Sequence, residues 1–348
     1  MTVGSDAVGD GSFMGGGAHA RVARRILADM RHGLDLARLS VEGGAERWPD
    51  ALLAELRFHL AGLLNAMELA IGLHLSDSRV EGLIGALGPG HCRGAIESAP
   101  GLLGPNLLAH LRRRAICAML LRRASAAGAT GRPVVQSEAL TALALAEQRW
   151  IAPMLLDAPM RPDLPAEPYH DLAWSVAALL IHGCEQRAGM RDPALSAALA
   201  QATERLVARH DEGQGVQALA QRCARTLPPE SARALAGAAL VEGRLLLFAA
   251  LAGHETGLPI ETVIDIMADG PAPARHAVMR LAGIEDAIAF RAAELLGPLV
   301  IGSAGDEALA RFLERYRTVD DVHARAWLAD ATGPAILADK LAMLGSPR

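Results

Sequence analysis

Residues 231–283 read SARALAGAALVEGRLLLFAALAGHETGLPIETVIDIMADGPAPARHAVMRLAG. Apolar residues recur in this stretch at three- and four-residue steps, as in Ile260, Val263 and Ile264. A period of this kind places apolar side chains on one side of a helix. The stretch therefore predicts a run of short helices that pack through apolar faces.

Glycine and proline divide these predicted helices. Gly243 interrupts the apolar run and is expected to separate two helices. Gly257 is expected just past a helix end in a left-handed conformation, which glycine adopts at little cost. Pro259 is expected to begin the next helix, because a proline in the first turn gives up no hydrogen bond.

The same stretch resembles the C-terminal signature of an all-helical alphaproteobacterial family known only as a domain of unknown function. The shared features are Glu242-Gly243, Phe248 in an Ala/Leu helix, Gly257-Leu258-Pro259 and Leu281-Ala282-Gly283. The match covers residues 215–300 clearly and the chain before them faintly. The resemblance implies a helical, repeat-like bacterial protein, and it brings no catalytic residue with it.

Composition extends the helical prediction to the whole chain of 348 residues. Hydrophobic residues make up 51% of it and aromatic residues only 3%, so Ala, Leu, Ile, Val and Met must build the core. Ala and Leu are strong helix formers. We predict an all-α fold, either a multi-helical bundle or an irregular, solenoid-like helical array.

Helices are expected over 18–40, 49–75, 77–87, 92–98, 105–125, 137–152, 169–189, 193–210, 214–226, the central stretch, 284–297, 304–317 and 319–345. Helix 49–75 carries a wide apolar stripe, which suits the centre of a bundle or a homodimer interface.

Four regions are predicted along the chain. Residues 1–17 are rich in Gly, Ser and Asp and are expected to be disordered. Residues 18–155 are expected to form an N-terminal helical bundle. A proline-rich linker would cover 156–168, and a second helical domain would cover 169–348.

Charge and cysteine content restrict location and partners. The net charge of −5 makes a nucleic-acid partner unlikely, because such proteins usually carry a basic surface. No signal peptide and no membrane-spanning apolar stretch is recognised, so we expect a cytoplasmic protein that does not bind membranes. The cysteines are far apart in sequence, as expected of buried reduced thiols. They are Cys92, Cys117, Cys184 and Cys223.

His59 is the one candidate for a chemical role. It lies inside the helix at 49–75, and the helix at 18–40 would complete a hairpin like the phosphotransfer hairpin of bacterial sensor kinases. The alternative is a structural histidine at the edge of the core. His182 with Glu185 cannot close a metal site alone, so we expect no metal and no cofactor.

Two further segments are candidate interaction surfaces. The first is a run of arginines, which on a helix would form a solvated face or contact an acidic partner. The second is a set of prolines spaced three apart, which suits an extended polyproline segment. These residues are Arg112, Arg113, Arg122, Arg123, Pro159, Pro162, Pro165 and Pro168.

Together these features favour a non-enzymatic helical protein that serves as a protein-interaction or regulatory scaffold, with another protein as its partner. Two alternatives stay open beside it. One is a phosphotransfer component that uses His59, and the other is a small-molecule binder with an apolar pocket between helices. An enzyme with a site that sequence patterns do not reveal is also compatible with the chain.

Overall fold

The computed structural model describes residues 50–128, 137–151, 162–300 and 306–331. Within these ranges the protein consists of fifteen α-helices and two short 3-10 helices, with no strand. The predicted all-α fold is therefore confirmed. The predicted disordered segment 1–17 and the predicted helix 18–40 lie outside the described residues.

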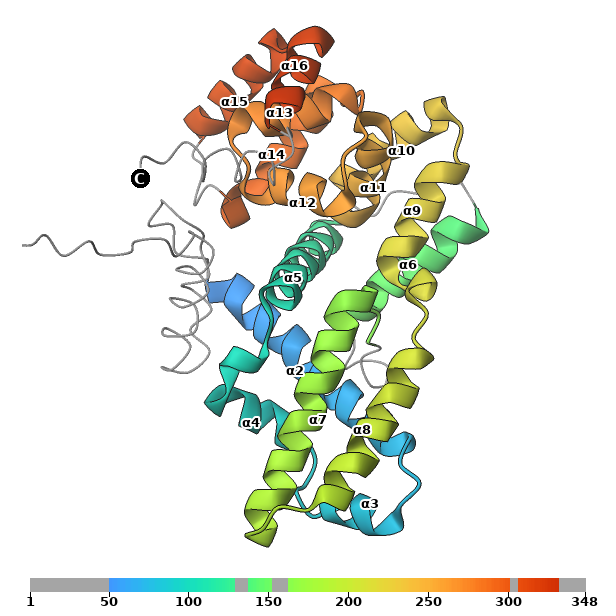
Figure 1. Cartoon of the computed structure of the whole chain (residues 1–348). Helices are drawn as coiled ribbons and strands as arrows, with labels where there is room; N and C mark the ends of the chain where they lie inside the picture. The colour runs from blue at the N-terminus through green and yellow to red at the C-terminus, as the bar shows by residue number, and fades with distance from the viewer. Residues whose placement is uncertain (1–49, 129–136, 152–161, 301–305, 332–348) are drawn as a thin grey trace, which may run out of the picture.

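The helix α5 (Pro105–Ala126) occupies the middle of the molecule. Figure 1 shows it between α2 (Asp50–Leu73), α7 (Ala166–Ala188) and α8 (Pro193–Ala208) on one side and the C-terminal helices on the other. It contacts α2, α6, α7, α11, α12 and α14. A helix in this position cannot present a wide surface to solvent, which bears on the arginines that it carries.

The apolar stripe of α2 lies inside this bundle. Its leucines are buried against α4, α5, α7 and α8. The stripe is therefore not free to form the predicted homodimer interface, because other helices of the same chain cover it. By length and composition α2 could cross a membrane, which is weak evidence by itself because the core helix of a soluble protein passes the same test.

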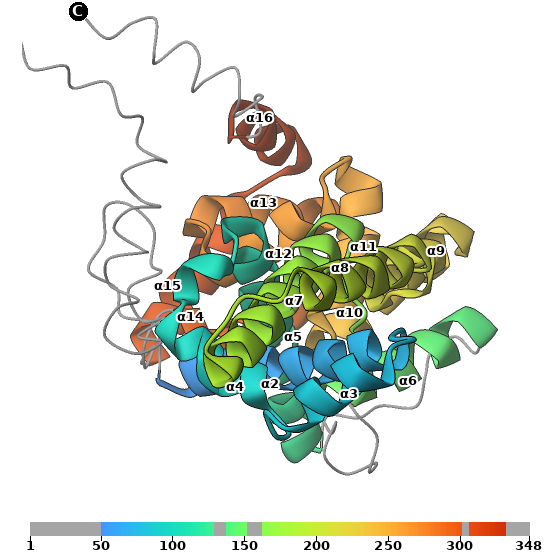
Figure 2. The ribbon, with the colours of Figure 1, turned by 60° about the horizontal axis from the view of Figure 1, so that its bottom comes forward.

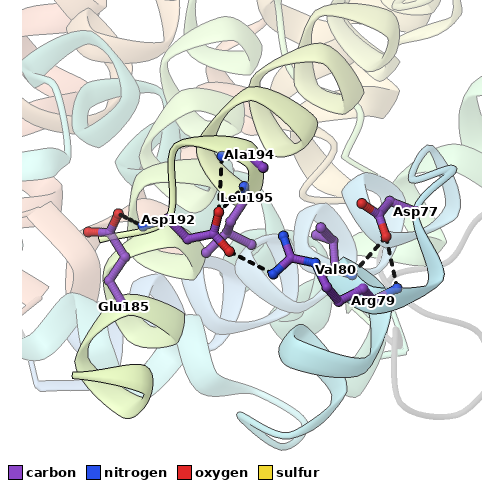
Figure 3. A network of polar contacts seen from close by, with 7 residues as sticks. All are labelled: Asp77, Arg79, Val80, Glu185, Asp192, Ala194 and Leu195. Atoms are coloured by element: carbon purple, nitrogen blue, oxygen red, sulfur yellow. Dashed lines mark hydrogen bonds and ion pairs between the residues drawn. The ribbon is translucent and has the colours of Figure 1, made fainter. Parts of the chain in front are cut away.

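Polar caps tie the lower end of the bundle together (Figure 3). Asp77 caps α3 (Ser78–Gly85), and Asp192 caps α8 by accepting from two backbone N–H groups. Arg79 donates to the second oxygen of Asp192 at 2.8 Å. The backbone N–H of Asp192 donates to Glu185 of α7 at 3.3 Å. Figure 2 shows this end from below, with α3 and α4 (His91–Ser98) beside α2 and α7.

The central stretch forms four helices, of which two, α11 and α12, contact α5. They are α10 (Pro229–Val241), α11 (Leu245–Thr256), α12 (Ile260–Asp269) and α13 (Ala272–Leu281). The residues from Leu245 to Gly253 are all buried, so α11 is the apolar core of the C-terminal helices. The predicted break at Gly243 is present between α10 and α11.

The remaining helices pack in pairs or on the helices already described. α6 (Glu138–Ile151) packs against α9 (Val216–Thr226), and the 3-10 helix η4 (Glu212–Gln214) precedes α9. α14 (Asp286–Val300) and α15 (Asp306–Thr318) pack together, and α16 (Asp321–Ala331) packs on α13. Within the described residues the predicted helices are present, with ends shifted by a few residues, and the C-terminal part of the predicted helix 319–345 lies outside these residues.

Local predictions hold well at the glycines and cysteines. Gly257 caps α11 with a φ of 75°, as predicted. Pro259 is the residue before α12 rather than its first residue. All four cysteines are free and buried.

The predicted division at 156–168 does not match the contacts between helices. That prediction assigns α7 and α8 to the second domain. Both helices pack against α2 of the first domain, and α7 also packs against α4 and α5. The C-terminal part of the predicted linker, from Ala166, already belongs to α7.

Candidate functional site

Arg114 of α5 is the centre of a buried network of charges. It is 2% exposed and is the largest fully buried side chain of the described residues. Its Nη1 donates to Oδ1 of Asp163 at 2.5 Å. Its guanidinium carbon lies 4.8 Å from the centre of the Trp150 ring. The indole Nε1 of Trp150 donates to the other Asp163 oxygen at 2.9 Å, so both carboxylate oxygens are bound.

Asp163 stays charged in this environment. Burial alone would raise the pKa of its carboxyl group, but the attraction of Arg114 and the hydrogen bonds from Trp150 and Arg114 outweigh burial. The pKa therefore lies below its ordinary value. Asp163 and Arg114 form a buried ion pair whose remaining hydrogen-bonding groups are largely satisfied.

The network continues from Arg114 to His59. The Nδ1 atom of His59 accepts from Nε of Arg114 at 3.2 Å. Because arginine is always protonated, Nδ1 must be the unprotonated nitrogen. The proton of the neutral ring therefore sits on Nε2, which lies 3.0 Å from Oε1 of Glu55. Burial lowers the pKa of His59 and favours this neutral form.

This geometry corrects the phosphotransfer hypothesis for His59. A phosphate acceptor must be reached by a donor from solvent, and His59 is 0% exposed. Nδ1 already accepts from Arg114, and Nε2 faces Glu55. The structural alternative, a histidine of the core, is the one that agrees with the structure.

Glu55 and Arg122 complete the network at its other end. Arg122 donates to Oε1 of Glu55, the same oxygen that faces His59. Burial alone would raise the pKa of Glu55, but the neighbouring His59 and Arg122 outweigh burial, so the pKa lies below its ordinary value. A continuous network of polar side chains thus runs from the half-exposed Arg122 through the bundle to Asp163.

A pocket of about 260 Å³ opens beside Asp163, where α7 begins and α8 ends. Its wall includes the ring of His210, which stacks on Tyr169 with centroids 3.7 Å apart and an angle of 9°. Nε2 of His210 lies 2.9 Å from the carbonyl oxygen of Leu164 and donates to it, since a carbonyl only accepts. The polar side chains of the wall are His74, Asp163, Arg209, His210, Asp211 and Gln214.

His74 is the unusual group of this wall. Both of its ring nitrogens are shielded from solvent, and neither has a hydrogen-bond partner among the described residues. Its carbonyl oxygen accepts from Arg205 of α8 at 2.8 Å, which fixes the end of α2 at the pocket. An imidazole with unused donor and acceptor groups is suited to bind a polar ligand.

A smaller cavity of about 20 Å³ lies on another side of Asp163. His110, Arg113 and Arg114 line it together with Trp150. Burial, and then the charge of Arg114, lowers the pKa of His110 to about 3. Asp163 lines both spaces, so it stands between the pocket and the interior.

The arginines of the predicted surface instead contact the helices that surround α5. Arg113 binds both oxygens of Asp265 in α12, at 2.9 and 2.6 Å, and Arg112 pairs with Asp269 of the same helix. Arg122 pairs with Glu55, and Arg123 donates to the carbonyl oxygen of Leu295 in α14 at 3.3 Å. These arginines tie α5 to its neighbours because α5 lies in the middle of the fold.

The predicted proline surface is also absent over the described prolines. Pro162 lines the pocket, and Pro165 is the residue before α7. Pro168 is buried in the first turn of α7, a position that tolerates proline. Pro159 lies outside the described residues. The three described prolines therefore do not share one exposed face.

Sequence reasoning missed Asp163, Trp150 and Glu55. Asp163 lies 49 residues from Arg114, and no spacing rule connects them. The only local signal was an isolated acidic residue among prolines. Of the described residues, no group of three His, Cys, Asp or Glu side chains could hold a metal ion.

Comparisons of the chain with protein-family models, with curated proteins and with solved structures found no match. The resemblance to a helical family over residues 215–300 therefore stays a prediction.

Proposed function

We propose that this protein is a non-enzymatic regulatory binding protein, and that the pocket beside Asp163 binds a small polar molecule. One observation carries the proposal: the buried network of Arg114 ends at the wall of a solvent-open pocket. A buried charge network is costly to maintain and is sensitive to a change at any member. Its meeting with an open pocket supports a binding role.

The wall of the pocket supports a polar ligand with donors and acceptors. Arg209 supplies a cation at the rim, and Asp211 supplies an anion. His74 has unused nitrogens, as described above. The volume of about 260 Å³ is below the usual range for drug-sized ligands, so the ligand is small. The surface that lines the pocket is mostly apolar, as in the interhelical pocket expected from the sequence, and these polar groups are set into it.

A bound ligand would act on the rest of the protein through the residues that it contacts in the pocket. A ligand that binds Asp163 competes with Arg114 and Trp150 for its oxygens. A change at Arg114 reaches His59 of α2, so the contact between α2 and α5 senses the pocket. A protein partner would respond to that change. The four free cysteines support a reducing compartment such as the cytoplasm.

The test is a thermal-unfolding screen of the full chain against a collection of small polar metabolites. We expect some compounds to raise the melting temperature, since a ligand that binds only the folded state stabilises it. Gln214 lies exposed at the pocket, so Gln214→Trp should fill its mouth and abolish these shifts. The matched control is Gln221→Trp, an exposed residue of α9 outside the pocket, which should leave them unchanged.

Two results would contradict the proposal. The first is a screen in which no compound stabilises the wild-type chain. The second is a set of stabilising compounds that act equally on Gln214→Trp and on Gln221→Trp, which would place their site elsewhere.

A further inference from the structure

The wall of the pocket beside Asp163 includes a nearly buried hydroxyl group that the protein itself does not use. Tyr169 is only 4% exposed, yet its hydroxyl has no hydrogen-bond partner among the described residues. The hydroxyl is also not one of the polar atoms that are shielded from solvent. A buried tyrosine hydroxyl normally finds a partner. Because Tyr169 lines the pocket, its hydroxyl is available to a ligand there.

Two opposite charges line the same pocket and are not paired with each other. Arg209 follows the last residue of α8, is exposed, and has no ion pair among the described residues. Asp211 lies two residues further along the chain. Its Oδ1 caps η4 by accepting from the backbone N–H of Gly213 at 2.9 Å. The other oxygen of Asp211 has no partner among the described residues.

Asp163 does not add a second free anion to this wall. Arg114 and Trp150 bind its two oxygens, and the ion pair with Arg114 compensates its charge. The unpartnered imidazole of His74 adds a hydrogen-bonding group to the wall. The carboxylate and guanidinium charges that remain open to a ligand are therefore one cation, Arg209, and one anion, Asp211.

We propose that the pocket binds a free α-amino acid as its zwitterion, with the carboxylate at Arg209 and the ammonium group at Asp211. The inference rests on the proposed binding function of the pocket and names the class of its ligand. A ligand with only a negative charge would be repelled by Asp211, and one with only a positive charge would be repelled by Arg209. A zwitterion satisfies both groups, and the fork of donors on a guanidinium matches a carboxylate.

The size of the pocket and its remaining polar groups restrict the amino acid further. The cavity of about 260 Å³ lies below the usual range for drug-sized ligands, as suits a single amino acid. The hydroxyl of Tyr169 and the imidazole of His74 are left to bind the side chain of the ligand. We therefore expect an amino acid with a small polar side chain, such as serine.

Thermal unfolding of the full chain with each of the standard amino acids at equal concentration tests the inference. We expect amino acids with small polar side chains to raise the melting temperature of the wild type. The amino acid that stabilises most is then compared with two analogues that each lack one charge. For serine, these are 3-hydroxypropionate, which lacks the ammonium group, and ethanolamine, which lacks the carboxylate. Each should bind about fivefold more weakly than the amino acid, as expected for the loss of an exposed ion pair.

Two variants assign the two charges. Arg209→Gln should weaken binding of the amino acid about fivefold and leave binding of the amine analogue unchanged. Asp211→Asn should weaken the amino acid by a similar factor and leave the acid analogue unchanged. Asparagine keeps the oxygen that caps η4. Arg225→Gln is the control, because Arg225 is exposed on α9 outside the pocket. A general effect on folding would alter binding of both analogues alike.

Three results would overturn the inference. The first is that no amino acid raises the melting temperature of the wild type. The second is that an analogue with a single charge binds as tightly as the amino acid. The third is that Arg209→Gln and Asp211→Asn both bind the amino acid as the wild type does. The proposed binding function survives each of these results if other compounds stabilise the wild type and Gln221→Trp but not Gln214→Trp.

Discussion

The helices α5 and α11 are both interior helices, but they are held in opposite ways. α11 buries an unbroken apolar run from Leu245 to Gly253. α5 buries Arg114 and ties Arg113 and Arg122 to carboxylates on other helices. The partners of these arginines lie 49 to 152 residues away in sequence. The difference teaches that a charged run on a helix indicates a surface only when the helix lies at the surface.

Removal of one charge from α5 is the strongest test of this comparison. Arg114→Met deletes the guanidinium and leaves Asp163 buried without its counter-charge. We expect a loss of about 3–5 kcal/mol in the free energy of unfolding, the usual cost of breaking a buried pair. Urea denaturation of the purified variant measures it. A loss below about 1 kcal/mol, typical of an exposed pair, would contradict the buried network.

A double variant separates the charge from the shape. Arg114→Met combined with Asp163→Leu removes both charges, and it should be more stable than Arg114→Met alone. If instead the stability losses of the two single substitutions simply added up in the double variant, packing around Arg114 rather than charge would determine the stability.

Gly243 tests the contact between the two regions. It has a φ of 67°, and a Cβ there would lie 2.4 Å from the carbonyl oxygen of Leu120 in α5. Gly243→Ala should therefore combine left-handed backbone strain with a collision against a backbone atom, for a total of about 3 kcal/mol. Chemical denaturation gives the value. A neutral substitution would mean that α5 and the turn before α11 are not in close contact.

Acid unfolding tests whether the stability of the C-terminal helices around α11 also depends on a titrating group. The pKa of His276 is about 4 when folded, below the ordinary value of about 6.5. Between these two pH values the unfolded chain binds a proton that the folded chain does not, so stability falls as the pH falls. Below about pH 4 both states are protonated and the loss ends.

His276→Gln removes this titration. From pH 7 to pH 4.5 the wild type should lose about 2 kcal/mol more than His276→Gln does. Urea denaturation at both pH values measures the difference, and the contribution of other groups, including His110, cancels in it. Parallel losses in the two proteins would show that His276 is accessible to water in the folded state.

The sequence predicts the helices well because their signals are local. Apolar periodicity, and Gly or Pro at the ends, placed α12 and the left-handed Gly257 within a residue or two. The candidate site could not be predicted in this way. Its members Asp163, Trp150 and His59 come together only through the packing of helices. The sequence therefore left His59 open between a structural histidine at the edge of the core and an exposed phosphate acceptor.

The smallest effect is expected at Gly257, and it calibrates the larger one at Gly243. The two glycines have nearly the same φ, 75° and 67°, so both would place an alanine in the left-handed region. They differ in surroundings, because a Cβ at Gly257 would meet no atom within 4 Å. Gly257→Ala should therefore cost only the backbone strain, about 1 kcal/mol. The difference between the two variants in the same denaturation experiment isolates the collision with Leu120. Equal losses would show that α5 yields to the extra methyl group, and the turn at Gly243 would then not fix the position of α11 against α5.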